Sequence, residues 1–313
     1  MTQSTHTQST NQQIAPLQLT ATPYGWLGQF RAMASPCEIL LGPCDELMAR
    51  QLCAAAAAEA WRIEAKFSRY RPNSTLSQLN QQTGQWQTLD SETMSLLQFS
   101  KQCFDLSDGM FDISSGILRK VWQFDGSDNL PSDEAVAALL PLIGFDRVEL
   151  TADSAFIPAG MELDLGGIAK EYAVDKVGQL LLEFSASVEP ALSLVVNFGG
   201  DMLAARPKPA NDPWRIGIEH PGKPDQSAML VALCAGALAT SGDARRFLQK
   251  DGIRYSHILN PKTGWPVQNA PRSVTVSAPS CVMAGLLATT ALLQGEAAAE
   301  FLKNQGLKHW VIA

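Results

Sequence analysis

The sequence predicts an α+β fold, a mixed α/β sandwich in which helices cover an extended, partly antiparallel sheet. Segments with helical and strand-like patterns intermix along the chain without a strict strand-helix-strand repeat, and no internal repeat is visible. The chain has 313 residues, of which 46% are hydrophobic and 18% charged. It is therefore long enough for a large core, and we expect a single domain over residues 21–313.

Residues 1–20 are expected to form a disordered leader, because they are polar and uncharged. They lack the basic flank and apolar run of a secretory signal, and no apolar stretch in the chain reaches the roughly 18 residues of a membrane helix. With no signal peptide or lipoprotein cysteine motif visible, we expect a soluble cytoplasmic protein without a membrane span. A net charge of -7, from 31 acidic and 24 basic side chains, argues against a nucleic-acid partner.

The first third of the chain predicts one strand and three helical segments. Residues 38–42 ("EILLG") read as a strand, and residues 45–68 have the Ala/Leu composition of a long helix with Asp45 as its N-cap. Residues 71–80 combine a turn with a short helical piece. Residues 90–109 predict another helix that stops at a glycine.

The remainder of the chain is richer in strands. Residues 146–166 show strand-turn-strand patterning, residues 161–167 read as a strand that turns at two glycines into a helix, and residues 191–205 are a β-rich run broken by two more glycines. The other predicted elements are strands at 212–221, 227–242, 272–280 and 309–313, and an Ala/Leu helical stretch with a glycine break at 282–306.

Six cysteines occur without a C-x-x-C pair and mainly among apolar neighbours. They are Cys37, Cys44, Cys53, Cys103, Cys234 and Cys281. This distribution favours reduced, buried thiols over zinc ligands or disulfides.

The turn at Gly166-Gly167 has the chemistry of an anion site. Glycines between a strand and a helix let a ligand approach the backbone, whose N–H groups can bind phosphate. Lys170, one turn into the helix, would face the same anion, and Asp164 could accept hydrogen bonds from a base or sugar. A glycine pair alone is also typical of an ordinary tight turn, and the same alternative holds for the second pair, in "NFGGD" at 197–201.

Residues 237–267 concentrate polar side chains beside turns, which indicates a site. They are Thr240, Ser241, Asp243, His257, Asn260, Lys262 and Thr263. His257 lies between a strand-like segment and an Asn-Pro turn, where an imidazole could exchange protons near neutral pH. A packed or surface histidine is the alternative.

Three segments offer surfaces on which a planar ring could stack. Met33 supplies a soft apolar surface and Tyr70 a planar one, while Gly109, Met110 and Phe111 together offer backbone and an aromatic ring. Core packing explains each of them equally well.

Eight blocks, taken in order, resemble the FAD:protein FMN transferases, the ApbE family, over residues from about 28 to 295. The blocks are "AMASPCEI", "FSRYRPNSTLSQLN", "DGMFDISSGIL", "ELDLGGIAKEYAVD", "NFGGD", "ATSGDARR", "HILNPKTGWPV" and "SVTVSAPSCVMAGLLATTAL". The resemblance implies an ApbE-like (T-fold-like) sandwich. It also implies an enzyme that splits FAD at its pyrophosphate, using Mg²⁺, and attaches FMN to a threonine or serine hydroxyl of an acceptor flavoprotein, such as a subunit of a membrane redox complex.

The same resemblance implies the roles of individual residues. His257 matches the family's histidine, which takes the proton of the attacking hydroxyl. The implied FAD contacts are Met33, Tyr70, Gly109, Met110, Phe111, Asp164, Lys170 and the backbone of Ile258.

The implied metal site is where this sequence departs from the family. The family uses an aspartate, a threonine four residues later and a backbone carbonyl of the glycine turn, and these positions are Gly285, Thr289 and Gly167 here. Gly285 removes the carboxylate that Mg²⁺ favours as a ligand. Asn260 stands where many relatives have aspartate. Glu171 stands where glycine is common, on what is expected to be a helix surface.

Three functions therefore stay open. FAD phosphates, water and Asp164 or Asp243 could supply enough oxygen to hold the metal, which would keep FMN transfer. The chain could instead bind FAD without transferring FMN. It could also act as an FAD pyrophosphatase, with water replacing the acceptor hydroxyl and FMN and AMP released.

Overall fold

The start of the fold differs from the expected boundary at residue 20. A computed structural model describes residues 16–313, so the leader expected at residues 1–15 lies outside the described part. Strand β1 (Gln18–Thr22) pairs with β2 (Gly25–Ala32). The prediction of a disordered leader is therefore wrong for residues 18–20, which belong to β1. Their polar composition was misleading because an edge strand buries little of its surface, and β1 has no fully buried residue.

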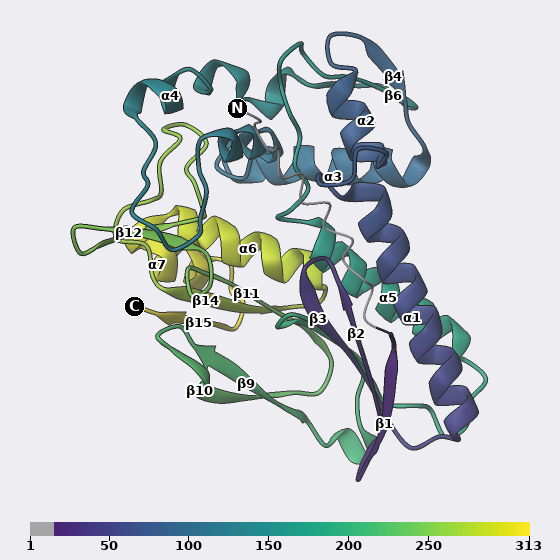
Figure 1. Cartoon of the computed structure of the whole chain (residues 1–313). Coiled ribbons are helices and arrows are strands. Elements are labelled where there is room, and N and C mark those ends of the chain that lie inside the picture. The colour runs from purple at the N-terminus through teal and green to yellow at the C-terminus, as the bar shows by residue number, and fades with distance from the viewer. Residues whose placement is uncertain (1–15) are drawn as a thin grey trace, which may run out of the picture.

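An eight-stranded sheet forms the centre of the molecule (Figure 1). Its strand order is β1, β2, β3 (Ser35–Leu41), β7 (Leu194–Phe198), β8 (Asp201–Arg206), β11 (Gly236–Gly242), β14 (Ser273–Ala278) and β15 (His309–Ile312). Every neighbouring pair of these strands is antiparallel. The sheet was expected to be partly antiparallel, and it is antiparallel throughout because each connection returns the chain in the opposite direction.

Three helices cover one face of this sheet (Figure 1). Helix α1 (Glu46–Phe67) packs on β2, α5 (Ala169–Phe184) on β7 and β8, and α6 (Cys281–Leu293) on β11 and β14. Helix α1 begins as the sequence predicts, since the side chain of Asp45 accepts the N–H of Met48 at 2.8 Å. Helices α5 and α6 also contact each other, and this contact becomes one wall of the candidate site.

The opposite face is covered by the hairpin of β9 (Trp214–His220) and β10 (Lys223–Leu233). Trp214 and Ile216 of β9 pack with Val195, Ala204 and Leu238 of the sheet. Apolar residues therefore lie on both faces of the central strands, as a sandwich requires.

The smaller elements lie mainly above the helical layer. They are α2 (Thr75–Gln81), α3 (Ser91–Leu106), α4 (Asp133–Ala137), α7 (Ala298–Asn304), the sheet β4 (Trp86–Thr88), β6 (Ser154–Phe156), β5 (Glu149–Leu150), and the hairpin β12 (Phe247–Lys250), β13 (Ile253–Ser256). Short 3-10 helices occur at Ile113–Lys120, Leu140–Leu142, Phe145–Arg147, Pro209–Asn211 and Gly295–Ala297.

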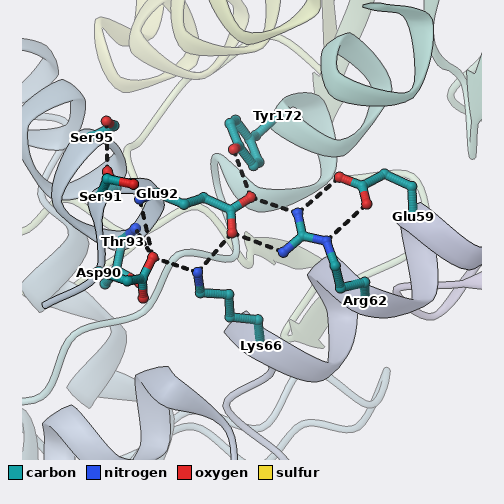
Figure 2. A network of polar contacts seen from close by, with 9 residues as sticks. All are labelled: Glu59, Arg62, Lys66, Asp90, Ser91, Glu92, Thr93, Ser95 and Tyr172. Carbon is teal, nitrogen blue, oxygen red and sulfur yellow. Dashed lines mark hydrogen bonds and ion pairs between the residues drawn. The ribbon is translucent and has the colours of Figure 1, made fainter. Parts of the chain in front are cut away.

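An ion-pair network ties α3 to α1 and α5 (Figure 2). Glu92 of α3 accepts hydrogen bonds from Arg62 and Lys66 of α1 and from the hydroxyl of Tyr172 on α5, at 2.7, 2.7 and 2.8 Å. The network joins three helices and so helps to position the start of α5.

Two expectations about local structure are corrected. Residues 161–165 precede the glycine turn but are not a strand. The side-chain amide of Asn80 donates to the carbonyl of Leu163 and accepts its N–H, both at 2.8 Å, in place of a neighbouring strand. Burial of the cysteines holds for Cys37, Cys53, Cys103 and Cys281, whereas Cys44 is half-buried and Cys234 is exposed.

No helix within residues 16–313 is long and apolar enough to cross a membrane.

Candidate active site

The glycine turn lies against the predicted ring platform at residues 109–111. A Cβ atom added to Gly167 would lie 3.3 Å from Cζ of Phe111, so these segments are in contact. Gly166 donates its N–H to Oδ1 of Asp164 at 2.9 Å. Both glycines are exposed, and Ile168 caps α5 without a side-chain hydrogen bond. The exposed start of α5 is therefore suited to an anion.

Lys170 is joined to the second glycine pair. Its Nζ lies 2.5 Å from Oδ2 of Asp201, which directly follows Gly199-Gly200 and is buried. Burial lowers the pKa of Lys170, but the nearby Asp201 and Glu171 carboxylates together outweigh this effect and raise it, so the lysine stays charged. Asp201 was not among the predicted site residues, although its place directly after two glycines was a usable signal.

Glu171 occupies the α5–α6 contact, and its expected position on a helix surface is wrong. The residue is only 9% exposed. An ideal Cβ added to Gly285 of α6 would lie 2.7 Å from Cγ and 3.2 Å from Oε1 of Glu171. Within the described chain, Oε2 of Glu171 has no hydrogen-bond partner. Burial, followed by the nearby Asp201 carboxylate, raises the pKa of Glu171 above its ordinary value.

The two predicted α6 positions lie one turn apart on the helix. Gly285 is buried, and the hydroxyl of Thr289 shares a hydrogen bond with Ser241 of β11 at 2.8 Å. The preceding residue of β11, Thr240, donates its N–H to Asp201 at 3.0 Å. Strand β11 therefore connects the Thr289 position to the Lys170–Asp201 pair.

Asp164 and Asp243, considered as other oxygen donors for a metal, already have partners. Asp164 is paired with Arg69. Asp243 is paired with Arg254 at 2.8 Å and with Arg272 at 2.7 Å. Over residues 16–313, no group of three or more His, Cys, Asp or Glu side chains is arranged to hold a metal ion.

His257 is held in a neutral state. Its Nδ1 lies 3.2 Å from the carbonyl of Arg246, and its ring meets Phe124 edge to face with centroids 6.2 Å apart. Burial, followed by the charge of Arg246, lowers the pKa of His257 to about 4. A neutral imidazole can accept a proton at physiological pH. The next residue, Ile258, donates its N–H to Oγ of Ser256 at 3.1 Å.

Tyr70 is an exposed ring held by an arginine that sequence reasoning missed. Tyr70 is 75% exposed, which argues against core packing. The guanidinium of Arg69 lies 4.8 Å from the ring centroid and donates to the phenol oxygen at 2.7 Å. Because Arg69 also pairs with Asp164, it links Tyr70 to the glycine turn. Arg69, Tyr70 and Glu162 line a hollow of about 370 Å³.

The other predicted ring surfaces are placed as follows. Met33 lies in the β2–β3 turn with a φ of 52°. Two residues on, Oγ of Ser35 would lie 2.9 Å from a Cβ added to Gly199, so this turn neighbours the second glycine pair. Gly109 lines a hollow of about 500 Å³ with Asp112 and Lys262. Met110 is half-buried and donates its N–H to Ser107 at 3.0 Å.

Comparisons with known proteins find relatives that match most of the chain. The model of the ApbE family matches residues 33–311. An FAD:protein FMN transferase of Vibrio cholerae is 34% identical over 242 residues, which cover 75% of this chain and 70% of that protein. The crystal structure of an ApbE protein from Thermotoga maritima superposes with a TM-score of 0.82 at 30% identity, covering 95% of this chain and 94% of the other. A flavin transferase ApbE structure from Vibrio cholerae gives a TM-score of 0.78 at 27% identity, with the same coverage.

Proposed function

The chain belongs to the ApbE family, and from this premise we propose that it is an FAD:protein FMN transferase that modifies a threonine or serine of an acceptor flavoprotein. The family match over residues 33–311 carries this proposal. The contact of the glycine turn with Phe111 supports it, because these two segments come from separate blocks and, with Lys170 one turn beyond the glycines, suit a diphosphate beside a ring.

FAD would be held by the two kinds of surface that the site combines. The exposed start of α5 and the charged Lys170 suit the pyrophosphate. Tyr70, Met33 and residues 109–111 suit the isoalloxazine and adenine rings. Asp164, fixed by Arg69 and Gly166, would position a sugar or base.

In the transfer step, the acceptor hydroxyl oxygen attacks the phosphorus on the flavin side of FAD. The pyrophosphate P–O bond breaks, AMP leaves, and a new phosphoester bond joins FMN to the acceptor. His257 takes the hydroxyl proton, which its lowered pKa of about 4 allows at neutral pH. The Lys170 ammonium would offset charge on the phosphates.

Mg²⁺ is proposed as a required cofactor. The carbonyl of Gly167 and the hydroxyl of Thr289 would hold it, since the first is exposed at the turn and the second lies on α6 beside β11. Gly285 itself supplies no side chain. When bound, Mg²⁺ neutralises charge that develops on the phosphate oxygens as the bond breaks.

Product analysis tests the transferase proposal. The protein is incubated with FAD, Mg²⁺ and an acceptor domain that carries a target threonine, and acceptor mass is measured. One added FMN per acceptor, with AMP released in equal amount, is expected. An unmodified acceptor with intact FAD would contradict transfer and support a protein that only binds FAD. FMN and AMP without modified acceptor would identify a pyrophosphatase.

The acceptor and the compartment are part of the proposal. A subunit of a membrane-associated redox complex is the acceptor class that the family resemblance suggests. Buried thiols at Cys37, Cys53, Cys103 and Cys281 support a reducing compartment, the cytoplasm.

A further inference from the structure

Two positions at which this chain departs from the family resemblance face each other. Glu171 stands where glycine is common in relatives, and Gly285 stands where they have aspartate. They are 114 residues apart in the sequence, yet the carboxylate stem of Glu171 lies directly against Gly285. Helix α6 therefore has no side chain at position 285, and the side chain of Glu171 on α5 lies at this place instead.

A side chain at position 285 cannot be accommodated while Glu171 keeps its present position. A Cβ at position 285 would lie 2.7 Å from Cγ of Glu171, which is closer than two carbon atoms can pack. Oε1 of Glu171 would lie only 3.2 Å from the same Cβ. The Glu171 carboxylate therefore fills the space into which a side chain from position 285 would project.

One oxygen of the Glu171 carboxylate also lacks a partner that would account for its burial. The residue is 9% exposed and its Oε2 is without a hydrogen bond within the described chain. The neighbouring cation, Lys170, forms its ion pair with Asp201 at 2.5 Å, and although Lys170 and Asp201 both act on Glu171, neither bonds this oxygen. Burying a carboxylate oxygen without a partner is costly, so a bound cation is the partner that the arrangement calls for.

We propose that Glu171 is the carboxylate ligand of Mg²⁺ in this chain, delivered from α5 in place of the missing side chain at Gly285. The inference rests on the proposed function, because it concerns the metal of that same site. The carbonyl of Gly167, four residues before Glu171, and the hydroxyl of Thr289, four residues after Gly285, would complete the protein ligands. Carboxylate, carbonyl and hydroxyl oxygens suit this hard cation.

Metal binding by Glu171→Gln tests the assignment without a turnover assay. Mn²⁺ is titrated into FAD-saturated protein and followed by electron paramagnetic resonance, with Mg²⁺ as competitor. Glu171→Gln keeps the size of the side chain but loses its charge, and we expect at least about a 10-fold weaker affinity. Glu183→Gln, an exposed change on the same helix, should leave the affinity unchanged. FAD affinity in EDTA should be equal in all three proteins.

A reciprocal exchange keeps the test decisive if Glu171→Gln does not fold. The double variant Glu171→Gly with Gly285→Asp moves the carboxylate to α6 and should recover metal binding that Glu171→Gly alone loses. Gly285→Asp alone should bind the metal no better than wild type, because the new side chain collides with Glu171.

Wild-type metal affinity in Glu171→Gln, or wild-type protein that binds neither metal, would overturn the assignment. If the metal binds through Glu171 but no FMN is transferred, the proposed function is refuted and the assignment of Glu171 as a metal ligand still holds.

Discussion

Two adjacent residues of α5 lie in regions with opposite electrostatics. In one region a carboxylate has several hydrogen-bond partners, and in the other a carboxylate oxygen is buried without one. Tyr172 joins the α1–α3 network, where Glu92 accepts hydrogen bonds from Arg62, Lys66 and Tyr172 (Figure 2). Glu171 turns to α6, where one of its oxygens has no partner within residues 16–313. The hydrogen bond from Arg62 is the main reason that the pKa of Glu92 falls to about 2, whereas burial raises that of Glu171.

The contrast separates structural charge from charge available to a ligand. In the network each acidic group has partners, so its contribution is to stability. At the α5–α6 contact one carboxylate oxygen is enclosed without a hydrogen-bond partner, and such a group calls for an explanation such as a bound ion or a role in catalysis. Changes in the network should therefore alter unfolding, and changes in the site should alter binding or rate.

His257→Ala should give the largest effect, confined to the site. Loss of the proton acceptor is expected to reduce FMN transfer by about 100- to 10,000-fold, while FAD affinity and the urea midpoint stay near those of wild type. Single-turnover transfer and FAD titration measure the two quantities. His220→Ala in the β9–β10 hairpin is the control and should transfer normally. A His257→Ala protein with full activity would remove the residue from the mechanism.

Glu92→Ala should give the largest loss of stability. It leaves Arg62 and Lys66, whose side chains are 45% and 19% exposed, without their shared acceptor. Because solvent partly screens these charges, we expect a loss of about 2 kcal/mol in unfolding free energy, measured in urea. Glu46→Ala, which breaks the exposed pair with Arg50, should cost less than about 0.5 kcal/mol. Equal losses in the two variants would contradict the structural role of the network.

The sequence allowed much of the fold to be predicted, because its local signals are strong. Asp45 caps α1 as predicted, and composition and apolar spacing located every α-helix except α4, as well as most strands. The strand predicted at residues 161–165 was wrong because these residues bond the side chain of Asn80, about eighty residues away in the sequence, instead of a neighbouring strand. No local pattern reports such a bond.

The candidate site was also predicted only in part, because sequence blocks report local motifs but not contacts between distant segments. The block resemblance indicated Lys170, His257 and the glycine turn, and the structure links Lys170 and the turn to their neighbours. Glu171 was expected on a helix surface, whereas its burial depends on the contact with α6. Tertiary contacts, rather than residue type, decided the accessibility of this carboxylate.

Acid should weaken the network through Glu92. Its pKa in the folded protein, about 2, lies below the ordinary 4.5, so the folded state binds fewer protons than the unfolded state between these values. The stabilisation is complete above pH 4.5 and is lost as pH falls toward 2. We expect Glu92 to account for a loss on the order of 1 kcal/mol between pH 5 and 3. Glu92→Gln should flatten this slope, and an unchanged slope would assign the acid sensitivity to other groups.

Asp175→Asn should give the smallest effect and tests whether the α5–α6 contact positions the metal ligands. Asp175 of α5 accepts the N–H groups of Cys281 and Val282 at the start of α6, at 2.8 and 2.9 Å. Since the amide keeps one acceptor oxygen, we expect a loss of about 1 kcal/mol or less. Ser280 caps the same helix by accepting the N–H of Met283 at 3.3 Å, but it has no such bond to α5.

Ser280→Ala is therefore the matched control for Asp175→Asn. Both variants should lower the unfolding free energy by similar amounts, because each loses one side-chain acceptor for the N–H groups at the start of α6. Only Asp175→Asn should also weaken Mn²⁺ binding to the FAD-loaded protein, by a few-fold, because it loosens the helix that carries Thr289 from the helix that carries Glu171. If both variants keep wild-type metal affinity, the docking of α5 on α6 contributes to stability alone, and each ligand is positioned by its own helix or turn.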